Sequence, residues 1–324
     1  MGRNHVRAYR ELLGTQLVGV ADQNLAVASA VAELHGCAAY GDHRQLLSEA
    51  RPEAVSVAVS TAAHFEVVRD CLQSGAHVLV EKPIAPTLEE AAQLVACAGE
   101  AGRVLMVGHI ERFNPAVIEL KRRLDASELG PIFSAKAQRI GPFPPRVRDV
   151  GVVIDLATHD LDVMRYLFRS EVTRVYAETR REVHTLAEDM VNALIRFENG
   201  IIGSLEINWL TPTKVRELTV TGKNGMFKAD YLTQDLLFFE NADQGGDRRW
   251  NPLSVLRGVR EGPMTRYAID KQEPLKNELT AFLEAASGSG GSAASAEDGT
   301  AALRLALALI ESGRTGRVVE LGHG

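Results

Sequence analysis

Two groups of residues in this sequence have the types and spacing that proton transfer requires. The tripeptide Glu-Lys-Pro at 81–83 ends the run 77–80, whose last three residues are aliphatic. Asp155 and His159 stand four positions apart. A lysine beside a sheet can approach a cofactor and a substrate together. A histidine suits abstraction of a hydroxyl proton, because its unperturbed pKa lies near neutrality. The two groups predict acid–base chemistry on a small molecule.

The tripeptide stands where a buried strand should meet the open edge of a parallel sheet. Aliphatic strands that alternate with helices are typical of such sheets, whose ligands bind outside the carboxyl ends of the strands. Lys82 would then lie at that edge, with Glu81 beside it. The alternative is a surface Glu–Lys pair before a turn, which the tripeptide alone does not exclude.

The acid–histidine pair lies in the segment Val152–Phe168, which has the pattern of a helix. Residues four apart share one helical face, so Asp155 and His159 can point to a common place. The carboxylate can orient the imidazole and raise its basicity. The alternative is a surface polar pair, but the surrounding aliphatic residues indicate a largely buried helix, where such pairs are more often functional.

The first third of the chain alternates strands with helices at intervals of roughly thirty residues, the pattern of a doubly wound sheet. Strands are predicted at 16–21, 54–59, 77–81 and 104–108, and helices at 24–35, 64–74, 88–101 and 115–126. These elements predict a Rossmann-type α/β domain over residues 1–112.

After residue 130 the pattern changes to longer strands with alternating polarity. They are predicted at 132–140, 172–182, 189–197, 201–209 and 215–221, with Asn-Gly turns that favour hairpins. Residues 113–324 are therefore predicted to form an α+β domain with a mostly antiparallel sheet. Its last helix, 300–312, can pack back on the first domain.

The chain opens on a predicted helix, without the strand that should precede it. In a doubly wound domain the first strand is central, and its turn into the first helix carries the phosphate-binding glycines, of which only Gly2 is present here. Losing ~5 hydrogen bonds at ~1 kcal/mol each, plus buried aliphatic residues at ~1.5–3 kcal/mol each, would rival a total stability of ~5–15 kcal/mol. We therefore expect the natural protein to begin upstream of Met1. Cooperative melting and dinucleotide binding by this chain alone would contradict that expectation.

Several positions in the first domain predict a dinucleotide cofactor. Asp22 ends a strand about twenty residues after the glycine turn, where a carboxylate binds the ribose hydroxyls and repels a 2′-phosphate, so NAD is favoured over NADP. Ser60, Thr61 and His64 follow the next strand and can line the cofactor cleft. Helix capping by Asp22 or Thr61 is the alternative, and it does not exclude a cofactor role.

Three arginines are candidate contacts for phosphate groups. Arg112 follows the strand 104–108 and could contact the cofactor or a phosphorylated substrate. Arg146 and Arg148 lie in a Pro-rich loop before the acid–histidine helix, where guanidinium groups would suit a diphosphate. A solvated basic loop is the alternative for this pair.

The composition argues against several classes of partner. With 36 basic and 42 acidic residues and a net charge of −6, the chain is not suited to nucleic acid, which demands a basic face. Cys37, Cys71 and Cys97 have no metal-site spacing, so we expect reduced thiols and no metal. No apolar run reaches the ~18 residues of a membrane span and no signal peptide is recognisable, so we expect a soluble cytoplasmic protein.

Taken together, these motifs resemble the Gfo/Idh/MocA family of nicotinamide-dependent oxidoreductases, from residue 2 almost to the end of the chain. The resemblance rests on Glu-Lys-Pro at 81–83, on Ser60-Thr61 with His64, and on Asp155 four residues before His159. A departure is Ala62, where many members have proline. Segments that look most like UDP-N-acetylglucosamine 3-dehydrogenases within the family are 108–115, 141–145, 149–155 and 273–279.

The resemblance implies a Rossmann domain followed by an open-faced antiparallel sheet, which usually forms the interface of a homodimer or homotetramer. It implies that Lys82 hydrogen-bonds the reacting hydroxyl and the nicotinamide side of the site, and that Glu81 also lies against the cofactor. His159 would take the hydroxyl proton while the C3 hydride passes to NAD, and Asp155 would orient the lysine and the histidine. The substrate would be a sugar or nucleotide sugar, such as a UDP-N-acetylhexosamine.

Three alternatives remain open. An inositol or a free aldose could be the substrate, and some members of the family use NAD transiently to cleave a glycoside. A catalytically silent regulatory subunit is disfavoured, because Lys82, Asp155 and His159 are all present. Net formation of NADH with a nucleotide sugar would separate a dehydrogenase from a glycosidase.

Overall fold

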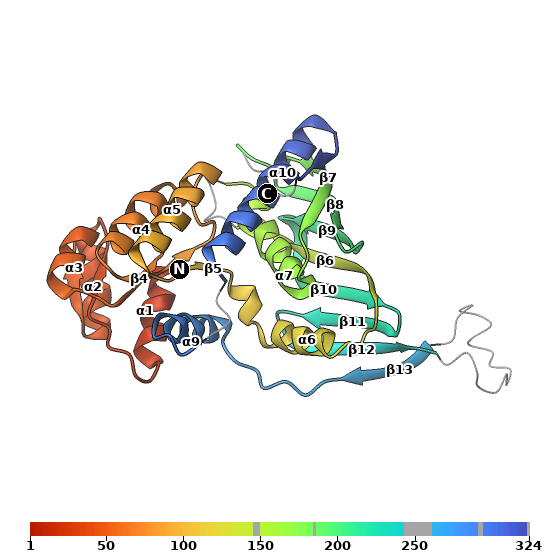
Figure 1. Ribbon diagram of the computed structural model, residues 1–324, viewed down its shortest axis with the longest axis horizontal. Coiled ribbons are helices and arrows are strands. Elements are labelled where there is room, and N and C mark those ends of the chain that lie inside the picture. The colour runs from red at the N-terminus through yellow and green to blue at the C-terminus, as the bar shows by residue number, and fades with distance from the viewer. Residues whose placement is uncertain (145–149, 184–185, 243–260, 291–293, 323–324) are drawn as a thin grey trace. The chain divides into compact units, whose positions relative to one another are not determined.

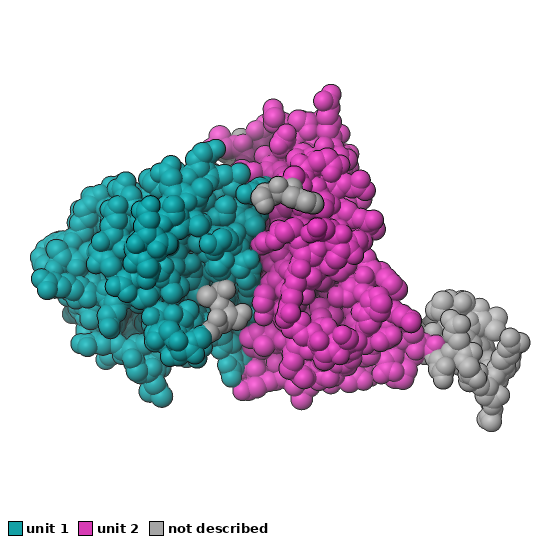
Figure 2. Space-filling model, in the orientation of Figure 1, with its two compact units in different colours: residues 1–113, 272–304 teal, residues 114–271, 305–324 magenta. Residues whose placement is uncertain are grey.

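The computed structural model describes residues 1–144, 150–183, 186–242, 261–290 and 294–322 (Figure 1). The chain divides into two compact units (Figure 2). Unit 1 is Met1–Phe113 with Gln272–Arg304, and unit 2 is Asn114–Lys271 with Leu305–Gly324. The division at 113/114 lies next to the expected boundary at 112/113, and the chain returns to unit 1 for residues 272–304.

Unit 1 contains parallel strands in two separate sheets. β1 (Gly19–Ala21) pairs with β2 (Ala38–Tyr40), while β4 (His77–Glu81) lies between β3 (Ala54–Val57) and β5 (Leu105–Gly108). No pairing joins β1 to β3 among the described residues. This break falls where a central first strand would pair in a doubly wound sheet. The architecture is that of a Rossmann-type domain with parallel strands and flanking helices, as the sequence predicts.

Helices connect and flank these strands. They are α1 (Gly2–Glu11), α2 (Leu25–His35), α3 (His43–Ala50), α4 (His64–Gln73), α5 (Leu88–Ala101) and α9 (Pro274–Ala286), with the 3₁₀ turns η1 (Thr61–Ala63) and η2 (Ile110–Phe113). The predicted bounds of α5 are confirmed, because Thr87 caps its start and the left-handed Gly102 ends it. The sequence prediction misses α9, and it misses β2 and α3, whose few residues carry little periodic signal.

The core of unit 1 fixes the carboxyl ends of its central strands. Leu79 of β4 and Met106 of β5 are fully buried in one cluster with Leu279 and Phe282 of α9 and Ala8 of α1. Burial of a large apolar side chain contributes about 1.5–3 kcal/mol. Helices from both ends of the sequence thus hold the strands that precede the Lys82 loop and η2.

Unit 2 is built on a nine-stranded sheet with the order β13-β12-β11-β10-β6-β9-β8-β7-β14. The strands are β6 (Ile132–Pro142), β7 (Val172–Arg180), β8 (Met190–Phe197), β9 (Ile202–Asn208), β10 (Leu210–Gly222), β11 (Gly225–Asp230), β12 (Asp235–Asn241), β13 (Glu261–Arg266) and β14 (Val319–Glu320). All neighbouring pairs are antiparallel except β6 and β9. The predicted, mostly antiparallel sheet is confirmed, and β11 to β13 extend it beyond the predicted strands.

One face of this sheet is covered and the other is open. The covering elements are α6 (Pro115–Asp125), the π-helical turn η3 (Val153–Ala157), α7 (Thr158–Phe168) and the later part of α10 (Ala296–Thr315). Alternate strand residues, such as Ala193 and Ile195, are buried in the same cluster as these helices. Leu194, between them, is about half exposed. This is the open-faced sheet that the family resemblance implies.

α10 begins in unit 1 and ends in unit 2 as one continuous helix, longer than the predicted 300–312.

Across the described ranges, no helix has the combination of length and apolar character that crossing a membrane requires.

Candidate active site

Lys82 directly follows β4, the middle strand of the three-stranded sheet. Its bond to Pro83 is cis, and the next residues, Ile84 and Ala85, are fully buried. The chain therefore turns into the core directly after Lys82. This places the residue at the carboxyl edge of the parallel strands, where such sheets bind their ligands.

The neighbouring Glu81 is held by a residue that is distant in sequence. Nε2 of His5, in α1, lies 2.8 Å from Oε1 of Glu81, and the imidazole donates because a carboxylate only accepts. Gly108, paired with Glu81 on β5, leaves room for this side chain: a Cβ at Gly108 would lie 3.3 Å from both Cα and Oε2 of Glu81. The sequence prediction misses His5. Its place three residues after Gly2, at the start of the first helix, is the one signal that could have found it.

His64, the first residue of α4, contacts the same loop. Its Nδ1 lies 2.7 Å from the carbonyl oxygen of Pro83, and its Nε2 lies 3.3 Å from that of Val59. Burial lowers the pKa of His64, although both carbonyls favour the charged form. The ring thus contacts the protein's own backbone, and its predicted contact with a cofactor stays a prediction.

The amino end of α1 has the properties of an anion site. Gly2 is the first helical residue, the first turn contains no acidic side chain, and no side chain caps the helix. The first N–H groups of a helix lack intrahelical partners, and the positive end of the helix dipole attracts phosphate. This end of α1 therefore fits the pyrophosphate of a dinucleotide.

Asp22 lies directly after β1 and is exposed. Its Oδ1 accepts a hydrogen bond from the amide of Asn24 at 2.8 Å, and Asn24 rather than Asp22 caps α2. The capping alternative is therefore wrong for Asp22. It is also wrong for Thr61, because the cap position of α4 is Ala63. Asp22 at the end of its strand fits an acceptor for ribose hydroxyls.

Of the three arginines predicted to contact phosphate groups, the structure describes Arg112 alone. Arg112 is buried in η2, and its Nη1 donates to Oδ2 of Asp298, in α10, at 2.8 Å. This ion pair ties η2 to the start of α10 within unit 1, so contact of Arg112 with a phosphate stays a prediction. Arg146 and Arg148 lie outside the described residues.

In unit 2, Asp155 lies in η3 and His159 lies in the first turn of α7. The predicted helix over 152–168 is confirmed, with a π-helical turn at its start. Such turns are frequent at functional sites. Both side chains are half-buried, and their spacing keeps them neighbours on the helix surface.

A buried ion pair fixes this helix against the sheet. Nε of Arg139, on β6, lies 2.6 Å from Oδ2 of Asp160, and Nη2 lies 3.1 Å from Oδ1. The two side chains are 4% and 2% exposed. Because Asp160 is adjacent to His159, the bidentate pair sets the position of the histidine backbone. The sequence contains a signal for this contact. Arg139 stands two residues after Ala137 in the strand, so both side chains lie on the same, buried face of the sheet.

A second carboxylate binds the amino end of the same helix. Oε1 of Glu188 accepts from the amide of Val153 at 3.1 Å, and the Glu188 carbonyl accepts from the amide of Val152 at 2.9 Å. A Cβ at Gly151 would lie 2.1 Å from Oε1 of Glu188, so any larger residue there would displace this carboxylate. An acid at this end stabilises the helix through the N–H group and the dipole. No local pattern in the sequence predicts this contact.

The structure thus groups Glu81, Lys82 and His64 in unit 1, and Asp155 with His159 in unit 2. Each group stands where the sequence predicts it, after a central strand and on a helix of the second half.

Two family models match the chain. Residues 1–109 match the model described as "Oxidoreductase family, NAD-binding Rossmann fold", and residues 117–228 match the model described as "GFO/IDH/MocA C-terminal domain".

Individual proteins match over most of the chain. UDP-N-acetylglucosamine 3-dehydrogenase of Acidithiobacillus ferrooxidans is 31% identical over 287 residues, covering 88% of this chain and 85% of that protein. A solved structure of that enzyme superposes with a TM-score of 0.82 at 30% identity, covering 96% of this chain and 93% of the other. Inositol 2-dehydrogenase 2 of Saccharopolyspora erythraea is 29% identical over 329 residues, covering 98% of this chain and 91% of that protein.

Proposed function

Because the chain belongs to the Gfo/Idh/MocA family of NAD-binding oxidoreductases, we propose that it oxidises the C3 hydroxyl of a UDP-N-acetylhexosamine. Family membership makes the protein an oxidoreductase acting on CH–OH groups, and the nucleotide sugar is the proposed part. The observation that carries it is the 31% identity, over 88% of the chain, to a UDP-N-acetylglucosamine 3-dehydrogenase.

The residues of unit 1 fit NAD. The uncapped amino end of α1 at Gly2 would hold the pyrophosphate, and Asp22 would accept hydrogen bonds from the ribose hydroxyls and repel a 2′-phosphate. Ser60 and Thr61, which follow β3, would lie along the same cofactor. When bound, NAD supplies the acceptor for a hydride from the sugar carbon.

We assign the proton chemistry to one side chain in each unit. Lys82 hydrogen-bonds the reacting hydroxyl, His159 takes its proton, and Asp155 orients both. Oxidation of an alcohol to a ketone releases one proton and one hydride, so a single base beside a positioned donor is sufficient. Positioning can contribute ~7–11 kcal/mol, and proton transfer a further ~10²–10⁴-fold in rate.

The substrate is tested by NADH formation. The protein is incubated with NAD⁺ and, separately, with UDP-N-acetylglucosamine, myo-inositol and glucose. We expect kcat/KM with the nucleotide sugar to exceed the others at least ~10-fold, because buried polar groups left unpaired by a smaller substrate disfavour it. NADH formation with myo-inositol but not with UDP-N-acetylglucosamine would contradict the proposal.

The site assignment is tested by Lys82→Met and His159→Ala. Each should lower kcat at least ~10³-fold, because a positioned donor or the base is lost, while affinity for NAD⁺ stays within ~threefold. Lys223→Met, at an exposed turn between β10 and β11, is the control and should keep full turnover. Turnover of either site variant within tenfold of the wild type would refute the assignment.

An inositol dehydrogenase is the second candidate. The observation in its favour is the match to inositol 2-dehydrogenase 2, which extends over 98% of this chain at 29% identity. The same NADH assay separates the two candidates. It also tests a redox-assisted glycosidase, which would consume a nucleotide sugar without net NADH.

We further propose that two or four copies associate through the open face of the nine-stranded sheet, around Leu194 and Ile202. Light scattering of the wild type should give a dimer or tetramer mass, and Leu194→Arg should lower it. We place the protein in the cytoplasm, where its three free cysteines would remain reduced, and cell fractionation tests this.

A further inference from the structure

We propose that His5 is a positioning residue that holds Glu81, and thereby the adjacent Lys82, in the geometry that hydroxyl oxidation requires. The proposal rests on the role given to Lys82 above, and the experiment below separates a failure of one from a failure of the other.

The first observation is the contact itself. His5 and Glu81 are 76 positions apart, and 2.8 Å separates Nε2 from Oε1. His5 is 2% exposed, so water cannot easily replace the carboxylate. Nδ1 of His5 has no hydrogen-bond partner among the described residues. Among the described residues, the ring is therefore anchored through Nε2, which donates its hydrogen bond to Glu81.

The second observation is how closely Glu81 is enclosed. Gly108 lies opposite it on β5, and a Cβ at Gly108 would be 3.3 Å from both the backbone and the carboxylate of Glu81. The absence of a side chain at this position gives the carboxylate the space to reach His5. Glu81 is thus fixed between α1 and β5.

The third observation is that both neighbours of Lys82 are held. Glu81, before it, is bound by His5, and the carbonyl of Pro83, after it, accepts a hydrogen bond from His64 at 2.7 Å. A shift of the backbone at Lys82 would therefore strain one of these two hydrogen bonds. Because a displacement of ~1 Å can cost ~100-fold in rate, fixed neighbours matter for a lysine that must meet one hydroxyl.

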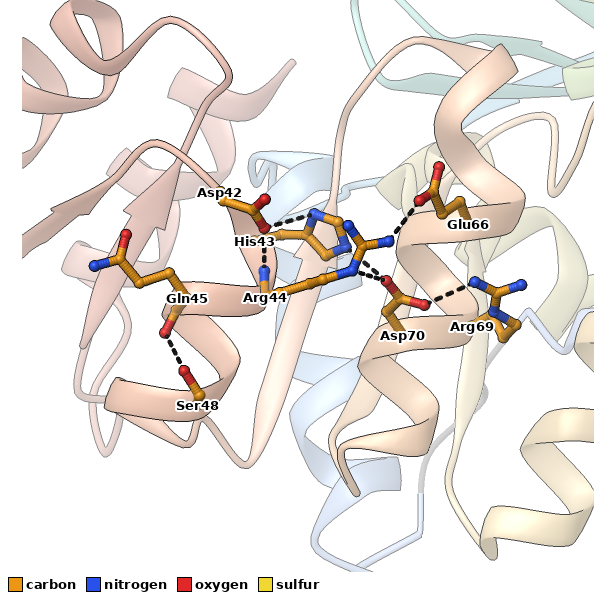
Figure 3. Close-up of polar contacts among 8 residues, drawn as sticks. All are labelled: Asp42, His43, Arg44, Gln45, Ser48, Glu66, Arg69 and Asp70. Carbon is orange, nitrogen blue, oxygen red and sulfur yellow. Dashed lines mark hydrogen bonds and ion pairs between the residues drawn. The ribbon is translucent and has the colours of Figure 1, made fainter.

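The competing explanation is that the contact only docks α1 on the sheet. The variants are His5→Ala, His5→Gln, which keeps a donor, and the double variant His5→Ala/Glu81→Gln. The matched control is His43→Ala. His43, in α3, makes the same kind of bond within unit 1, with Nε2 3.0 Å from Oδ2 of Asp70, in a network that Figure 3 shows to contain neither Glu81 nor Lys82.

Two measurements are made on each variant. Amide hydrogen exchange of Lys82, Ile84 and Ala85 needs no substrate, and in His5→Ala we expect it to accelerate at least ~10-fold while His43→Ala leaves it unchanged. With NAD⁺ and UDP-N-acetylglucosamine, His5→Ala should lower kcat at least ~10-fold with KM within ~threefold, and His5→Gln should recover most of the loss. The double variant should have no lower a kcat than His5→Ala, since the two residues act as one unit.

Unchanged exchange at Lys82, Ile84 and Ala85 in His5→Ala would overturn the proposal, whatever the turnover. Faster exchange with a kcat within threefold of the wild type would also overturn it, because the contact would then be structural only. If the wild type forms NADH with neither UDP-N-acetylglucosamine nor myo-inositol, the proposed function fails. The exchange measurement then still decides whether His5 holds the loop.

Discussion

The two groups assigned to the proton chemistry are held by different kinds of interaction. In unit 1, the Lys82 loop is held by two buried imidazoles, one bound to a carboxylate and one to a backbone carbonyl. In unit 2, the helix that carries His159 is held by a bidentate buried ion pair and by a carboxylate at its amino end.

The two kinds of interaction should respond differently to mutation, one mainly in stability and the other mainly in activity. Removing one partner of a buried ion pair leaves an uncompensated charge and costs about 3–5 kcal/mol. Removing the donor of a buried hydrogen bond costs about 1–3 kcal/mol. We therefore expect that the His159 helix cannot be displaced without destabilising unit 2, whereas the Lys82 loop can be displaced in a folded protein.

The largest effect is expected for Arg139→Met. It leaves Asp160 buried without its bidentate partner, so unit 2 should lose about 3–5 kcal/mol in free energy of unfolding. Urea unfolding followed by the fluorescence of Trp209, a buried residue of unit 2, measures the loss.

The double variant Arg139→Met/Asp160→Leu should recover most of this stability, since an apolar pair needs no charge compensation. Arg44→Met is the control. Arg44 pairs with Glu66 and Asp70 (Figure 3) but its side chain is 55% exposed, so its loss should cost no more than about 1 kcal/mol. Equal losses for Arg139→Met and Arg44→Met would remove the distinction between the two regions.

A smaller loss is expected for Gly151→Ala. The new Cβ would fall 2.1 Å from Oε1 of Glu188, so the carboxylate must leave the amino end of the helix. Loss of such a cap costs about 0.5–2 kcal/mol. Urea unfolding measures the cost, with Glu188→Gln as a control that keeps the acceptor. Undiminished stability of Gly151→Ala would show that Glu188 does not hold the helix.

The fold and the position of both candidate groups could be predicted from sequence, because the signals are local. Strand 77–81 is a short aliphatic run with a turn after it, and helix 88–101 has a cap at each end. The pair Asp155 and His159 is visible as a four-residue spacing among aliphatic neighbours. Such patterns need no information about distant parts of the chain.

The contacts that hold these groups could not be predicted, because they join distant segments, and even for His64, a predicted site residue, the sequence does not predict the bond to Pro83. His5 meets Glu81 across 76 positions, and Glu188 meets Val153 across 35. Arg139 is the exception, since its parity in a strand places a charge in the core and demands a partner. The sequence does not say that the partner is Asp160.

The pH dependence of stability sharpens the comparison in unit 1. Burial lowers the pKa of His64 in the folded state. As pH falls below the unfolded value of about 6.5, the unfolded state takes up the proton first, and stability is lost towards the lower folded pKa. His64→Gln keeps a donor for Pro83 but does not titrate, so its urea midpoint should fall less between pH 7 and 5. Parallel decreases in the two proteins would show that His64 is not buried in the neutral form.

The smallest change in stability, with a distinct change in activity, is expected for Gly108→Ala. Its Cβ would lie 3.3 Å from the backbone and carboxylate of Glu81, a distance that a shift of a few tenths of an ångström relieves. The cost in unfolding free energy should stay below about 1 kcal/mol, because β4 and β5 remain paired. The shift passes to Lys82 through Glu81, so kcat should fall by roughly tenfold even though the protein stays folded. A variant that loses neither stability nor turnover would mean that the loop tolerates displacement. Contacts with the bound substrate, and not the fixed loop after β4, would then position Lys82.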